Sequence, residues 1–283
     1  MFDKKYNRLF AVGCSFTKYY WPTWASVIST ELDIPLYNFG DIGASNPYIA
    51  SQLFQIDATY NLTEDDLIII NWSAHGRTSS LGIEYHDFVD TWYHSGGYDS
   101  KPKRTDALTY RTNLLNSLVA IKGSLAYQDS LPCDCLNFRI GDISGQKESS
   151  DAEIFKPFAT LEDSMYPSFL SILYPTCNNY QEVMDKYEEV IQSKPVDWYS
   201  KFRHRTISKV AIYGSRKESH PFPTEHVKIL EELLNCTISD ETKQKAKQDE
   251  KRYFLNHEEY LENRDFELER NQIFVSLPQT STK

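Results

Sequence analysis

Three short apolar segments, separated by two stretches of helical length, recur within the first 72 residues. They are residues 9–12, 35–39 and 67–70, and each is followed by a loop that contains Gly, Ser or Asn. Segments this rich in apolar residues are typical of parallel strands buried on both faces. The intervening residues 24–32 and 47–58 predict helices, with Thr23 at the N-cap of the first. This order predicts an α/β fold with a doubly wound parallel sheet.

The rest of the chain predicts further layers around a less regular middle. Residues 106–127 predict a long helix, residues 135–140 a fourth strand and residues 223–234 a closing helix. The apolar face of the long helix is expected to contain Leu114, Leu115, Leu118, Ile121 and Leu125. Residues 82–105, rich in Gly, His, Tyr and Asp, predict an irregular loop or lid. Residues 154–200 favour helices interrupted by prolines.

Two regions are expected along the chain. Residues 1–236 form the α/β domain, with residues 85–205 as an irregular middle insertion, and residues 237–283 form a charged C-terminal extension. Within the extension, residues 240–263 favour a solvated helix, because Glu and Lys mix there with few large apolar residues. We expect this helix to pack on the domain or on a protein partner.

Charge and cysteine content disfavour several classes of protein. The formal net charge is −10, which disfavours nucleic-acid binding because a phosphate backbone is repelled. The five cysteines are odd in number and scattered, so they predict free thiols, and no Cys or His pairs have zinc-finger spacing. No apolar run reaches membrane-spanning length, and residues 1–8 do not resemble a signal peptide. We therefore expect a cytoplasmic protein with no membrane partner, metal or organic cofactor.

Three loops carry the residue types that acyl transfer requires. Ser15 follows the first strand on a tight turn, Gly43 lies in the loop after the second strand, and Ser73 in the loop after the third. The carboxyl ends of parallel strands meet at one edge of a sheet, where ligands bind. A nucleophile surrounded by hydrogen-bond donors is the arrangement that stabilises a developing oxyanion.

A distant segment supplies a candidate base. His220 precedes Pro221, which keeps the backbone of the preceding residue extended, and Glu218 lies two residues earlier. A hydroxyl, an imidazole and a carboxylate together form the general arrangement of an activated serine nucleophile.

In this order the segments resemble the sequence blocks of the SGNH hydrolases, also called GDSL-like hydrolases. The blocks are Gly13-Cys14-Ser15-Phe16-Thr17, Gly43-Ala44-Ser45-Asn46, Trp72-Ser73 and His220-Pro221. The first block, followed by Pro22-Thr23-Trp24, is similar to a branch common in bacteriophage and bacterial gene sets. The resemblance implies a three-layer, flavodoxin-like α/β fold. It also implies Ser15 as nucleophile, His220 as general base and Gly43 as oxyanion-hole glycine.

Three positions depart from the family pattern. The third block usually reads Gly-x-Asn-Asp, whereas Trp72-Ser73-Ala74-His75 stands here, so Asn71, Ser73 and Asn46 are alternatives for the missing donor. The last block usually has Asp two or three residues before His, and only Glu218 can take that role here. Cys14 replaces the usual acidic residue before the nucleophile. Loss of one oxyanion donor typically lowers the rate by about 10²–10³.

These observations predict a serine hydrolase that cleaves an ester. The resemblance implies an O-acetyl group on a carbohydrate as substrate. We expect the oxyanion hole to contain Ser15 and Gly43, with Asn46 and Ser73 as candidates for the missing donor. Two alternatives stay open. One is an acyltransferase that uses the same Ser15–His220 pair. The other is a catalytically weak or inactive binding or structural protein of the same fold, for example a phage component associated with the virion.

Overall fold

A four-stranded parallel sheet forms the centre of the protein. The computed structural model describes residues 4–19, 21–73, 78–83, 90–95, 107–141, 152–176, 182, 186 and 220–255. The strands are β1 (Arg8–Gly13), β2 (Leu36–Gly40), β3 (Asp66–Trp72) and β6 (Asp134–Arg139). Their spatial order is β2-β1-β3-β6, and all neighbouring pairs are parallel. The chain reverses its direction of winding at β1, which leaves the carboxyl ends of β1 and its two neighbours open to carry a site.

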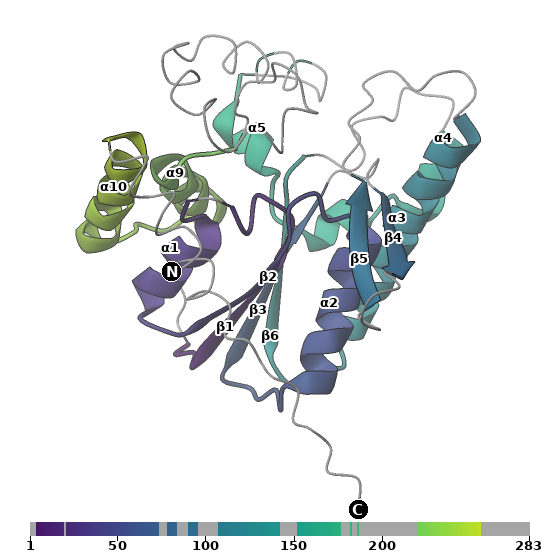
Figure 1. Ribbon diagram of the computed structural model, residues 1–283, viewed down its shortest axis with the longest axis horizontal. Helices are drawn as coiled ribbons and strands as arrows, with labels where there is room; N and C mark the ends of the chain where they lie inside the picture. Colours follow the sequence, from purple (N-terminus) through teal and green to yellow (C-terminus); the bar gives the residue numbers. More distant parts are fainter. Residues whose placement is uncertain are drawn as a thin grey trace, which may run out of the picture.

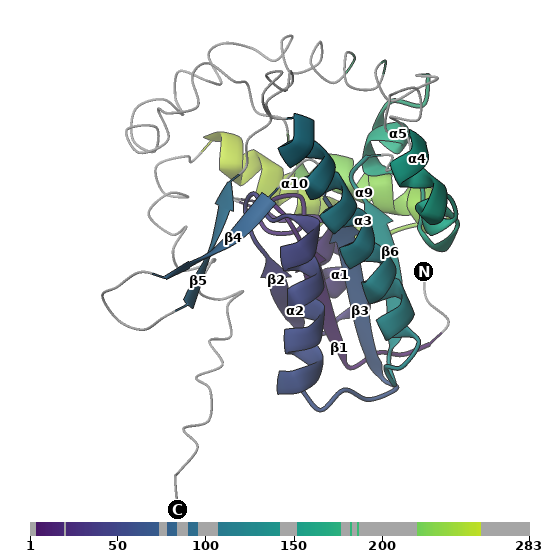
Figure 2. The same cartoon turned by 90° about the vertical axis from the view of Figure 1, so that its right-hand side faces the viewer.

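Helices cover both faces of this sheet (Figure 1). One face carries α2 (Asn46–Thr59) and α3 (Ala107–Gln128), and the other carries α1 (Trp24–Leu32) and α9 (Pro223–Leu233). Figure 2, turned by 90°, shows α2 and α3 lying side by side across the first face. The expected three-layer, doubly wound α/β fold is therefore confirmed.

The sequence explains why β1 and β3 occupy the centre of the sheet. Every residue of β3 is buried, and Leu67, Ile68, Ile69 and Ile70 have no exposed surface. Burying one such side chain contributes roughly 1.5–3 kcal/mol. β2 lies at the edge, where its residues Leu36 to Phe39 are only half-buried.

Short elements connect β6 to the second half of the chain. They are α4 (Ala152–Phe155), the 3-10 turns Lys156–Phe158 and Leu161–Ser164, and α5 (Phe169–Leu173). This agrees with the expectation of interrupted helices from residue 154 onward, since Pro157 and Pro167 lie in or beside the breaks. The expected helical part beyond residue 176 lies outside the described residues, except for positions 182 and 186.

The middle region departs from expectation. Residues 82–105 were expected to be irregular, but β4 (Thr78–Ile83) and β5 (Asp90–Ser95) pair as an antiparallel two-stranded sheet. Thr91, Trp92 and Tyr93 are residue types that favour strands, and this preference outweighs the loop-forming residues around them. β4 lies against α2, outside the main sheet.

The long helix α3 also differs at one position. Leu114, Leu118 and Ile121 are buried as expected, whereas Leu115 is 45% exposed. Leu114, Leu118 and Ile121 recur every three or four residues and share one stripe, while Leu115 lies about 100° away from Leu114 around the helix axis. The strand β3 extends two residues further than expected, so Asn71 and Trp72 belong to the strand and not to its loop.

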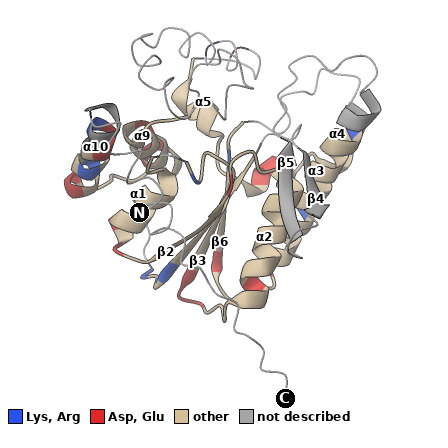
Figure 3. Cartoon of the chain, in the orientation of Figure 1, with Lys and Arg blue, Asp and Glu red and all other residues tan. Residues whose placement is uncertain are grey.

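The charged helix α10 (Asp240–Leu255) packs on the outside of α1 and α9. Both charge signs lie along it (Figure 3), yet Thr242 and Ala246 are buried, as is Ile238 just before it. Ser239 donates hydrogen bonds to Glu31 of α1, and Lys243 forms a 2.7 Å ion pair with Glu231 of α9. The helix is therefore attached to this domain. Residues 256–263 of the expected helix lie outside the described part of the chain.

No described helix is both long and apolar enough to cross a membrane.

Candidate active site

Ser15 lies in a single tight turn directly beyond β1. The carbonyl of Cys14 accepts hydrogen bonds from Thr17 N–H at 2.8 Å and Lys18 N–H at 3.1 Å, which closes the turn. The first N–H groups of such a turn have no partner within it. No hydrogen bond among the described residues uses the Ser15 N–H. Ser15 is only 3% exposed, so the turn holds it below the protein surface.

The turn depends on glycine at its entrance. A Cβ at Gly13 would lie 2.1 Å from Thr17 Oγ1 and 2.9 Å from the carbonyl oxygen of Asn71. Any other residue would therefore push Thr17 away from β1. The Thr17 carbonyl also accepts hydrogen bonds from Thr23 Oγ1 at 2.5 Å and from Asn38 Nδ2 at 3.0 Å. Thr23 stands at the N-cap of α1 as expected, but its hydroxyl holds the nucleophile turn and does not cap the helix.

His220 Nε2 lies 2.8 Å from Ser15 Oγ, across 205 positions of sequence. The expected hydrogen bond between these two residues is therefore present. The imidazole contacts two aromatic rings of the nucleophile loop. Tyr19 stacks on it at 3.8 Å between centroids, with the planes 20° apart, and Phe16 lies at 5.3 Å and 52°.

The segment after His220 is anchored on both sides. Trp21 Nε1–H donates a buried 2.7 Å hydrogen bond to the Pro221 carbonyl, and the Trp21 ring contacts Phe222. At the start of α9, Glu225 accepts a 2.8 Å hydrogen bond from the Phe222 N–H. These contacts fix the backbone from which His220 projects.

The loop after β2 presents Gly43 at the same edge of the sheet. Gly43 has φ 84°, in the left-handed region that favours glycine. On either side of it, Ile42 N–H donates to Asp41 Oδ1 and Ala44 N–H donates to the Asp41 carbonyl. Within the described residues the Gly43 N–H makes no hydrogen bond, so it is available to a ligand.

Asn46 joins the second loop to the third. Its Oδ1 accepts a 2.8 Å hydrogen bond from the Ser73 N–H, and its Nδ2 donates to the Ser73 carbonyl at 3.0 Å and to Ser117 Oγ at 3.4 Å. Both amide hydrogens are therefore in use. Asn46 was expected in the oxyanion hole, but this geometry makes it a residue that holds the Ser73 loop.

Two polar side chains near the end of β3 are buried without partners among the residues that the structure describes. Neither Ser73 Oγ nor either polar atom of the Asn71 side chain forms a hydrogen bond. Strand alternation puts Asn71, and Ser73 after it, on the face that α1 and α9 cover, from which His220 also comes. Gly13 of β1 and Asn71 of β3 are register partners. Ser15 and Ser73 each follow two residues later, so they occupy equivalent positions beyond the two strands. Of the three alternatives for the missing donor, this leaves Ser73 and Asn71.

Charged groups border the nucleophile turn. Burial lowers the pKa of Lys18, and the nearby Asp41 carboxylate partly offsets this effect. Burial and Asp41 together raise the pKa of Tyr48 to about 12. The Asp41 carboxylate of the second loop thus influences both Lys18 of the nucleophile turn and Tyr48 of α2.

His226 is a second histidine near the base. It is 1% exposed and its Nδ1 has no hydrogen-bond partner in the described structure. Burial, and to a smaller extent His220, lower its pKa from 6.5 to about 3, so it is neutral at physiological pH. Its place on an apolar helix face gave no functional signal in the sequence.

Glu218, the expected acidic partner of His220, lies outside the described residues. Within the described residues, no group of three His, Cys, Asp or Glu side chains is arranged to hold a metal ion. Cys14, Cys133, Cys135 and Cys236 are free thiols, and Cys177 is outside the described part. The roles of Tyr19 and Trp21 were not predicted, because neither belongs to a recognisable motif.

Comparison with known proteins gives weak likenesses. The sequence matches no profile of a protein family and no curated protein. Among solved structures it is similar to "a putative lipolytic protein of G-D-S-L family" from Desulfitobacterium hafniense, at 15% identity and TM-score 0.35, over 59% of this chain and 79% of the other. It is also similar to "a putative SGNH hydrolase" from Slackia heliotrinireducens, at 14% identity and TM-score 0.32, over 81% of this chain and 99% of the other. Because these values are low, the chemistry of the site has to be judged from its own contacts.

Proposed function

We propose that this protein is a serine hydrolase that cleaves an ester. The observation that carries the proposal is the 2.8 Å contact between Ser15 Oγ and His220 Nε2, at the carboxyl end of β1. A base within about 2.6–3.2 Å of a hydroxyl is the geometry needed to remove its proton during attack. The available N–H groups of Ser15 and Gly43 supply the complementary donors for an oxyanion.

In the first half of the reaction, Ser15 Oγ attacks the ester carbonyl carbon while its proton moves to His220 Nε2. The carbonyl π electrons move to oxygen, and the N–H groups of Ser15 and Gly43 stabilise the charge, with the Ser73 hydroxyl as a third donor. The carbonyl then re-forms and the bond to the alcohol breaks. The leaving alkoxide takes the proton from Nε2, and an acyl-Ser15 remains.

In the second half, His220 Nε2 accepts a proton from water as the water oxygen attacks the acyl carbon. Collapse of the second oxyanion breaks the bond to Ser15 Oγ, which recovers its proton from Nε2. Glu218 is proposed to orient the other nitrogen of His220. The substrate class that we propose, an O-acetyl group on a carbohydrate, comes from the motif resemblance.

The Ser15→Ala variant tests this function. We expect purified wild-type protein to hydrolyse an activated acetyl ester above background, and a fluorophosphonate to label one serine per chain. Both signals should disappear in Ser15→Ala, while the free energy of unfolding should change by about 1 kcal/mol or less, because only one hydroxyl is lost.

Ser130→Ala is the matched control. Ser130 is exposed at the end of α3 and its hydroxyl donates to the Tyr127 carbonyl, so both activities should be retained. Mass spectrometry of the labelled peptide identifies the modified serine. Equal hydrolysis by wild type and Ser15→Ala would exclude the esterase. If Ser15 is labelled but the acyl group passes to an added alcohol in preference to water, the protein is an acyltransferase.

A further inference from the structure

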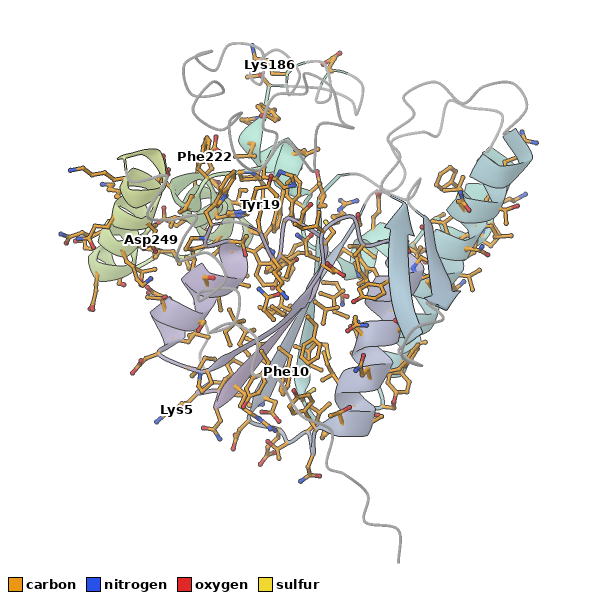
Figure 4. All side chains as sticks on the ribbon, in the orientation of Figure 1. Lys5, Phe10, Tyr19, Lys186, Phe222 and Asp249 are labelled. Carbon is orange, nitrogen blue, oxygen red and sulfur yellow. The ribbon has the colours of Figure 1, made fainter. Side chains whose placement is uncertain are left out.

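The closest ring contact of the site involves a residue outside the proposed reaction steps. Tyr19 stacks nearly parallel on the His220 imidazole, with centroids 3.8 Å apart and planes 20° apart. Figure 4 labels Tyr19 and Phe222 at the carboxyl end of the sheet, and Lys5 at the opposite end. Parallel stacking covers one face of the imidazole and leaves its edge, which carries Nε2, directed at Ser15 Oγ.

Neighbouring contacts hold Tyr19 in this position. Its ring meets Trp21 edge to face at 4.6 Å and 78°, and Trp21 in turn lies 5.3 Å from Phe222. The Trp21 N–H donates to the Pro221 carbonyl at 2.7 Å. Tyr19 therefore contacts the face of the His220 imidazole, while Trp21 contacts the Pro221 carbonyl and the Phe222 ring. Together they hold the segment 220–222.

The nucleophile and these aromatic residues belong to the same short loop. Ser15, Phe16, Tyr19 and Trp21 all lie between β1 and α1, whereas His220 comes from a segment 205 positions away. A base brought from so far along the chain needs contacts that fix its ring relative to the nucleophile. Misplacement of a reacting group by about 1 Å can lower a rate by about 10²-fold.

We propose that Tyr19 is a positioning residue for the general base, fixing the plane of the His220 imidazole and stabilising the imidazolium that forms when Ser15 loses its proton. The proposal rests on the proposed function of the Ser15–His220 pair. An aromatic face attracts a cation within about 6 Å of the ring centroid, and the attraction is strongest when the pair is removed from water. The positive charge develops on the imidazole as Ser15 loses its proton, so the contact strengthens toward the transition state.

Three other described groups near the imidazole do not take this role. Phe16 is tilted at 52° and lies 5.3 Å away, so it meets the imidazole obliquely and does not stack on it. His226 is neutral and buried, so it brings no charge that could stabilise the imidazolium. The hydrogen bond between Ser15 Oγ and His220 Nε2 leaves the imidazole free to rotate about the axis of that bond.

The test compares Tyr19→Leu with Tyr19→Phe. Tyr19→Leu is expected to lower kcat for an activated acetyl ester roughly three- to thirtyfold, with KM changed less than twofold, and to slow fluorophosphonate labelling of Ser15 equally. Tyr19→Phe keeps the ring and should restore at least half of the wild-type kcat. Tyr60→Leu, which removes a half-buried tyrosine from the Phe10–Tyr37 cluster, is the control and should leave kcat unchanged.

A spectroscopic measurement separates this proposal from the proposed function. With ¹³C-labelled histidine, the ring signals of His220, assigned by their absence in His220→Gln, should carry a ring-current shift from Tyr19. The shift should be lost in Tyr19→Leu and kept in Tyr19→Phe, whether or not the ester is cleaved. An unchanged His220 signal in Tyr19→Leu would overturn the proposal, as would an unchanged kcat or a Tyr19→Phe variant as slow as Tyr19→Leu. Failure of hydrolysis and labelling in wild type would overturn the proposed function instead.

Discussion

At the scale of single residues, the site depends on close packing of backbone against side chain. Gly13 ends β1 and is followed at once by the nucleophile turn, whose Thr17 occupies the space that a Cβ would take. The motif resemblance places glycine here, but sequence alone does not say which atom excludes a larger residue. The structure identifies Thr17 Oγ1 and the carbonyl of Asn71 as those atoms.

Gly13→Ala should therefore damage both stability and activity. Forcing a methyl group against Thr17 Oγ1 and the Asn71 backbone is an overpacking change, which typically destabilises by about 1–3 kcal/mol. It should also lower kcat, because the turn carrying Ser15 has to shift. Chemical denaturation and ester hydrolysis measure the two effects.

Gly123→Ala is the matched control for this change. Gly123 lies within α3, and a Cβ there would meet no atom within 4 Å. Alanine in a helix interior should stabilise the protein by roughly 0.5–1 kcal/mol and leave kcat unchanged. A Gly13→Ala protein as stable and active as wild type would show that the turn can move without consequence.

At the scale of elements, two features show what the sequence could and could not predict. The strands and helices of the first 72 residues were predicted to within about two residues, because their apolar runs are continuous and separated by turn residues. Topology also predicted that the loops of Ser15, Gly43 and Ser73 lie at one sheet edge, whereas His220 was added from its place before Pro221 and from the motif resemblance. The β4–β5 hairpin and the contacts of Tyr19 were not predicted, since pairing partners and ring stacking depend on tertiary geometry that leaves no periodic pattern.

The packing of α10 on α9 also escaped prediction in its details. Glu250 of α10 accepts hydrogen bonds from Thr224 Oγ1 at 2.6 Å and from Thr224 N–H at 3.2 Å. Thr224 lies in the first turn of α9, where backbone N–H groups lack helical partners and a carboxylate is favoured. A residue of α10 thus caps the helix that follows His220.

Glu250→Ala should lower the free energy of unfolding by about 1 kcal/mol, as loss of a helix cap does. Glu250→Gln keeps an acceptor without the charge and should lie between wild type and Glu250→Ala. Gln248→Ala, an exposed position on the same helix, should change nothing measurable. Urea denaturation followed by circular dichroism compares the four proteins, and equal stability of Glu250→Ala and Gln248→Ala would show that the cap contributes nothing.

At the scale of the whole molecule, stability should depend on pH through groups buried between layers. Burial would raise the pKa of Asp66, but hydrogen bonds from Arg8 and Thr63 outweigh it and hold that pKa below its ordinary value. A carboxyl with a lowered pKa in the folded state stabilises at neutral pH, and that stabilisation is lost as the pH falls from the ordinary pKa of aspartate through the lowered one. His226 acts at higher pH, because its pKa in the unfolded chain is 6.5 and in the folded protein about 3.

Between these two pKa values the unfolded chain binds a proton at His226 that the folded protein excludes, so stability falls as the pH falls. For this single group, the free energy of unfolding should decrease by about 2 kcal/mol between pH 7 and pH 5. His226→Leu has no proton to exclude and should lack that part of the decrease. Val227→Ala keeps the histidine while removing buried methyl groups from the next position, so it should be less stable at both pH values and keep the wild-type slope. Guanidinium denaturation at pH 7 and pH 5 measures the free energy of unfolding of all three proteins. The same decrease in wild type and His226→Leu would show that His226 is protonated in the folded protein or reached by water.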